Sequence, residues 1–110
     1  MIATQIARII ADFMIFLELT DDEMLDPDEA VEMMELLGSR LDEIDKGFLR
    51  QLVDAFPVIS LEYSGKSQEV VRNIPYSFYL EEALAANDPV KLAELEALRD
   101  AKGLNGGGEV

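Results

Sequence analysis

Residues 26–37 read DPDEAVEMMELL, and this stretch has the features of a helix start followed by an amphipathic helix. Asp26 is a residue type that caps helices, and Pro27 falls at the first helical position, where its missing N–H costs no hydrogen bond. Asp28 and Glu29 then lie in the first turn, beside the positive end of the helix dipole. Because the apolar residues that follow recur at the spacing of one helix face, the stretch predicts a long helix.

This predicted helix extends to about Ile44 and has one apolar face. Gly38 lies in its middle, where glycine costs about 1 kcal/mol relative to alanine. We therefore expect a close approach by another helix at Gly38. The residues expected to face the core are Ala30, Met34, Leu37, Leu41 and Ile44.

The segment before this helix, residues 2–19, is apolar on much of its circumference. Ile2, Ile6, Ile9 and Phe13 recur with the period of a helix, which predicts a helix of about five turns. An apolar surface this wide is typical of a helix at the centre of a core or of one that pairs with another subunit.

Prolines divide the second half of the chain. Pro57 is expected to end or kink a helix that starts at Asp45, and Pro75 is expected to stop a shorter one. Residues 58–63 have no partner strand and are expected to be irregular or helical. The expected helical segments are residues 45–56, residues 68–74, part of residues 75–86, and a last helix that opens at Pro89.

Together these segments predict an all-α fold. A chain of 110 residues and 12.3 kDa has the size of one domain. We expect a compact bundle of four or five helices, with the first two long helices antiparallel. The single helical domain is expected to span residues 1–104, and residues 105–110, with three consecutive glycines, are expected to be a disordered tail.

The composition excludes several classes of function. The chain has no cysteine and no histidine, which removes thiolate metal sites and the Ser-His-Asp and Cys-His catalytic arrangements. With 9 basic and 23 acidic residues the net charge is -14, which disfavours direct binding to nucleic acid. We therefore expect no enzymatic activity and no cofactor. No stretch has the pattern of a membrane span or a signal peptide, so a cytoplasmic location is expected.

Two short motifs fail to match a ligand site. Residues 65–67 read GKS, but a phosphate-binding loop needs glycine at position 60, which is Ser60, and a strand before it. An ordinary polar loop is expected there. The acidic residues 21–32 do not fit a calcium-binding EF-hand loop started at either Asp21 or Asp26. Helix capping explains these carboxylates without a metal.

The acidic residues concentrate in one part of the chain. Residues 18–45 hold twelve acids and one base, Arg40, which amounts to -11 of the total -14. Caps and first-turn positions account for the acids from Asp21 to Glu29 but not for Glu32, Glu35 and Asp42. Like charges at helical spacing cost about 0.2–0.5 kcal/mol per pair. Either solubility or the binding of a basic partner explains them. The candidate partner-binding residues are Asp28, Glu32, Glu35 and Asp42.

Aromatic residues cluster around Pro75. Tyr76, Phe78 and Tyr79 form a candidate aromatic patch that would line a pocket or a peptide groove. Packing in or beside the core is the alternative use of aromatic side chains at this spacing, and it is the commoner one.

The sequence of residues 16–31 is similar to a phrase found in a group of known proteins. Residues 16–23 read FLELTDDE and residues 26–31 read DPDEAV. The chain resembles a group of small acidic helical bacterial proteins of unknown function that share a phrase of the form FLE[LF][ST]DD[DE]xxDPDxAV. The resemblance covers roughly residues 13–80. It implies a helical fold, and it implies no activity and no functional residues.

Two hypotheses for function follow. The first is a non-enzymatic interaction protein whose acidic helical face binds a basic protein partner, as immunity proteins, antitoxins and DNA mimics do. The alternative is a homo-oligomeric accessory or structural protein, here a homodimer, that pairs through the first helix. In that case Ile10 and Met14 are expected to be outward apolar positions. An enzyme is the least supported class, because the usual nucleophiles and bases are missing.

Overall fold

The structure is a computed structural model that describes residues 2–107, with side chains described for residues 2–102. The predicted all-α fold is confirmed, because every regular element of the described residues is a helix. Five of these helices have thirteen residues or more, and α5 has five. The elements are α1 (Ile2–Leu19), α2 (Pro27–Asp42), α3 (Lys46–Ser60), α4 (Gly65–Ser77), α5 (Leu80–Leu84) and α6 (Pro89–Gly107).

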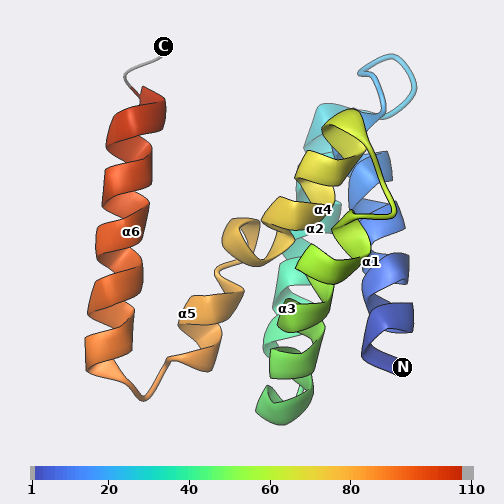
Figure 1. Ribbon diagram of the computed structural model, residues 1–110. Coiled ribbons are helices and arrows are strands. Elements are labelled where there is room, and N and C mark those ends of the chain that lie inside the picture. The colour runs from blue at the N-terminus through green and yellow to red at the C-terminus, as the bar shows by residue number, and fades with distance from the viewer. Residues whose placement is uncertain (1, 108–110) are drawn as a thin grey trace.

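Helices α1 to α4 pack together, whereas α6 stands to one side and is joined to them through α5 (Figure 1). Among the described residues of α6 up to Lys102, none is buried, although Leu92, Leu95 and Arg99 are partly covered. This offset helix lengthens the molecule, which has a radius of gyration of 14.7 Å. None of the described helices has the length and apolar character needed to cross a membrane.

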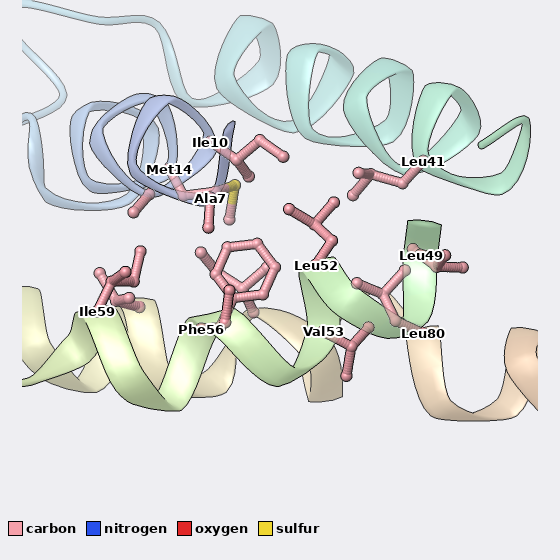
Figure 2. Close-up of a cluster of buried hydrophobic side chains, with 14 of the residues drawn as sticks. Ala7, Ile10, Met14, Leu41, Leu49, Leu52, Val53, Phe56, Ile59 and Leu80 are labelled. Carbon is pink, nitrogen blue, oxygen red and sulfur yellow. The ribbon is translucent and has the colours of Figure 1, made fainter. Parts of the chain in front are cut away.

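The hydrophobic core is centred on α3. Phe56 and Ile59 are fully buried, and Ala7 and Met14 of α1 point toward them (Figure 2). Small residues on the inner side of α1 allow its backbone to approach α3 closely. Leu41 of α2 and Leu80 of α5 close the same core, which holds one continuous cluster of buried side chains.

The expectation that Ile10 and Met14 point outward is wrong. Ile2 and Ile9 lie on the outer side of α1 instead and are 68% and 66% exposed. Ile10 and Met14, expected to point outward, are 8% and 1% exposed and belong to the core. The buried face consists of Ala3, Ala7, Ile10, Ala11, Met14 and Leu17. Burying the alanines favours close helix packing, which a pattern based on large apolar residues does not detect.

The predicted helix starts are confirmed by their capping bonds. The Asp26 carboxylate accepts a hydrogen bond from the Asp28 backbone N–H (2.9 Å), and the Asp45 carboxylate accepts one from the Phe48 N–H (3.1 Å). At the start of α6 the Asp88 carboxylate accepts one from the Lys91 N–H at 3.0 Å. Each bond satisfies a donor that the first helical turn leaves without a backbone partner.

Neither helix ends at its proline, so the predicted stop at Pro75 is wrong, and of the two outcomes expected at Pro57 the helix end is excluded while a kink stays a prediction. Pro57 lies inside α3, which ends at Ser60, and Pro75 lies inside α4, which ends at Ser77. Helix α4 also starts at Gly65, so residues 65–67 form its first turn rather than a loop. The tail expected at 105–110 lies partly outside the described residues: α6 includes 105–107, and residues 108–110 are not described, so the tail stays a prediction.

Candidate functional site

The four candidate acidic residues lie together on the outer face of α2. At about 100° per residue, Asp28, Glu32, Glu35 and Asp42 fall within about 80° of one another around the helix. All four are exposed. Within the described part of the chain, none of the four makes an ion pair. We call these four residues the acidic face.

Helix α2 is a peripheral helix. Of its sixteen residues only Ala30 and Leu41 are buried. Three large apolar residues, Val31, Met33 and Leu36, are between 39% and 51% exposed. The outside of α2 therefore combines carboxylates with accessible apolar groups, a mixture that suits protein binding.

The arginines that form ion pairs in the described residues do so away from the acidic face. Arg8 pairs with Glu62 (2.8 Å), Arg50 with Asp54 and Glu81 (2.6 and 2.8 Å), and Arg99 with Glu82 (2.6 Å). On α2 itself, Arg40 pairs with Glu43 at 3.2 Å. These ion pairs lie elsewhere in the fold, and none of them, among the described residues, involves a carboxylate of the acidic face.

The structure divides the candidate aromatic patch into two parts. Phe78 is partly buried and packs against the core. A Cβ atom placed on Gly38 would lie 3.0 Å from Cδ1 of Phe78, so the predicted close approach at Gly38 is confirmed and its neighbour is this ring. Phe78 therefore packs between α2 and the end of α4, while Tyr76 and Tyr79 contact Arg99 of α6.

Tyr76 and Tyr79 hold the side chain of Arg99. The guanidinium carbon of Arg99 lies 3.9 Å from the Tyr76 ring centroid and 3.7 Å from that of Tyr79. The same guanidinium donates to the Glu82 carboxylate and to the Tyr76 carbonyl, both at 2.6 Å. We call these four residues the Arg99 clamp. Arg99 follows the tyrosines by about twenty residues, and no spacing rule in the sequence indicates this contact.

Backbone strain accompanies the clamp. Tyr79 is the one described non-glycine residue with a positive φ, at 55°. A bulky side chain rarely adopts this left-handed conformation. Because Tyr79 directly precedes α5, the conformation turns the chain between α4 and α5 while the Tyr79 ring faces Arg99.

A groove of about 670 Å³ lies between α6 and helices α3, α4 and α5. Val53, Pro57, Leu95 and Leu98 give it apolar walls. Tyr76, Glu82 and Arg99 of the clamp line it too. In the described residues no group of three carboxylates lies close enough to hold a metal ion.

Tyr63 and Glu82, which lie at contacts between helices, have shifted pKa values. Burial, with a smaller effect of the 2.9 Å hydrogen bond to Asp12, raises the pKa of Tyr63 to about 12. The hydrogen bond from Arg99 lowers the pKa of Glu82 below its ordinary value. Both shifts belong to contacts between helices and not to the acidic face.

Comparison of the chain with family models, with curated proteins and with solved structures gives no match.

Proposed function

We propose that this protein is a non-enzymatic interaction protein that binds a basic protein partner through the acidic face of α2. One observation supports it above the others: four exposed carboxylates lie on one helix face without a basic partner among the described residues. The proposal takes α1 and α2 as antiparallel neighbours, as the short connection between Leu19 and Pro27 favours.

Electrostatics and apolar burial have separate parts in this binding. The uncompensated charge of the acidic face attracts a positive surface over about one Debye length and orients it during the encounter. Val31 and Leu36, which flank the acidic face on the helix, would then lose their exposed surface at the contact. Burial of such residues stabilises the complex after charge has steered it.

The proposal assigns the protein to the class of acidic binders that includes immunity proteins, antitoxins and DNA mimics. It also takes the protein to act in the cytoplasm and without direct contact with nucleic acid. The net charge of -14 supports the second point, because such a chain repels phosphate.

Affinity capture with matched baits tests the proposal. The baits are the wild type, the variant Glu32→Lys/Glu35→Lys/Asp42→Lys, and a control with Glu94→Lys/Glu96→Lys/Asp100→Lys. The control changes three exposed acids of α6 and the same amount of charge. Quantitative mass spectrometry should find a basic protein on the wild type and the control, and not on the α2 variant. Equal recovery on all three baits would contradict the proposal.

A further inference from the structure

Helix α1 presents an apolar seam to solvent. Ile2 and Ile9 are 68% and 66% exposed, and Phe16 is 51% exposed. These three residues are spaced seven apart, and the partly buried Ile6 and Phe13 lie between them. We call these five residues the α1 seam.

The α1 seam has the spacing of a coiled coil. Its residues follow one another at intervals of four, three, four and three, which is the heptad repeat of helices that pack side by side with interlocking side chains. This repeat lies beside the alanine-rich face that α1 turns toward α3. One helix thus has two packing surfaces. The core covers the alanine-rich face and reaches Ile6 and Phe13 of the seam, and it leaves Ile2, Ile9 and Phe16 exposed.

The helix that fits this seam is a second α1. Among the described helices, apolar repeats of this spacing also lie in α2 and α3, and both face the core. The core residues are Ala30, Met34, Leu37 and Leu41 in α2, and Leu52, Ala55 and Ile59 in α3. A seam that meets its own copy is self-complementary, as a two-fold symmetric dimer requires.

Charge favours the same arrangement. Two copies, each of charge -14, repel one another most where the acids are dense. Helix α1 has one base and two acids, whereas α2 has one base and five acids. Contact through α1 brings together the less acidic of the two helices and leaves α2 outside. We propose that this chain forms a homodimer through the α1 seam, independently of the partner proposed for α2.

Sedimentation velocity on the full chain tests the dimer. Between about 10 μM and about 500 μM, where small interfaces associate, the wild type should sediment with twice its 12.3 kDa mass. The variant Ile9→Glu should sediment as a monomer with unchanged far-UV circular dichroism, because Ile9 is exposed. The control Leu61→Glu, at a residue 77% exposed outside α1, should stay dimeric. A wild type that is monomeric throughout this range would overturn the proposal.

Disulfide cross-linking gives a second test of the dimer, which does not depend on the Ile9→Glu variant. Ile9 is the middle residue of the seam, so two seams that overlap over their full length bring it close to its own copy whether the helices run parallel or antiparallel. The chain has no cysteine, and Ile9→Cys introduces a single thiol. Under mild oxidation Ile9→Cys should give a covalent dimer on a non-reducing gel, and Leu61→Cys should not. If neither variant cross-links, or both do so equally, the α1 seam is not the interface.

Discussion

Replacing Arg99 by alanine is expected to release α6 while the remaining helices stay folded. The described part of α6 has no buried residue, so the Arg99 clamp is its strongest attachment. An isolated helix of this length is marginal in water. Once the clamp is removed, α6 should therefore open locally and not unfold the whole protein.

The size of the effect follows from the contacts. Each cation–π contact of Arg99, at 3.9 and 3.7 Å, contributes about 0.5–1 kcal/mol. The hydrogen-bonded pair with Glu82 contributes about 1.5–3 kcal/mol, because the two side chains are only 18% and 21% exposed. Since such terms are not fully additive, we expect the free energy of opening of α6 to fall by about 2–3 kcal/mol. That corresponds to hydrogen exchange about 30 to 150 times faster.

Hydrogen exchange measured by mass spectrometry reports this change segment by segment. Peptides from α6 should exchange faster in Arg99→Ala, while peptides from α1 and α3 keep the wild-type rates. The control Arg40→Ala removes the Arg40–Glu43 pair, whose side chains are 70% and 63% exposed. It should leave the exchange rates of α6, α1 and α3 unchanged, because exposed ion pairs contribute little to stability. Unchanged exchange in α6 would refute the clamp. A loss of protection throughout α1 and α3 would show that α6 is part of the cooperative core.

Three further predictions concern pH and the core. Because the clamp lowers the pKa of Glu82, its contribution is full above the ordinary value of about 4.5 and is lost as pH falls through the lowered pKa. Hydrogen exchange of α6 should therefore accelerate in acid, after correction for the intrinsic rate, and an unchanged corrected rate would contradict this. The pKa of Tyr63 is raised to about 12, so its contribution to stability is present below about pH 10 and is lost as pH rises through 12. Absorbance titration at high pH should show one tyrosine that ionises late, and Asp12→Ala should lower its pKa only in part, because burial is the main cause. Phe56→Ala should destabilise the fold by about 3–5 kcal/mol, since Phe56 is fully buried. Thermal melting should show a decrease of more than about 10 °C, and a decrease of under about 3 °C would contradict the central place of Phe56 in the core.

Local chemistry explains what could be predicted from the sequence. The aspartates at 26, 45 and 88 begin helices because a carboxylate next to a free N–H acts within a few residues of its own position. The core residues of α3 were recognisable for a similar reason, since Leu49, Leu52 and Phe56 follow one helical face and are buried.

Tertiary packing explains what could not be predicted. In α1 two apolar stripes compete, and the larger side chains of Ile2 and Ile9 face solvent because α3 packs closest against alanines. Pro57 and Pro75 remain inside helices beside residues that the core holds in place, Phe56 and Ile59 next to Pro57 and Ile74 next to Pro75. The Arg99 clamp joins residues from three helices, and no local pattern indicates such a contact.

The association rate of the recovered basic partner tests the acidic face most directly. In stopped-flow measurements at low salt, Glu32→Lys/Glu35→Lys/Asp42→Lys should associate more than about tenfold more slowly than the wild type. The control Glu94→Lys/Glu96→Lys/Asp100→Lys should associate at nearly the wild-type rate. The wild-type rate should also fall steeply toward about 0.5 M salt, where the Debye length is about 4 Å. Equal rates for the wild type and the α2 variant, with no dependence on salt, would contradict binding through the acidic face.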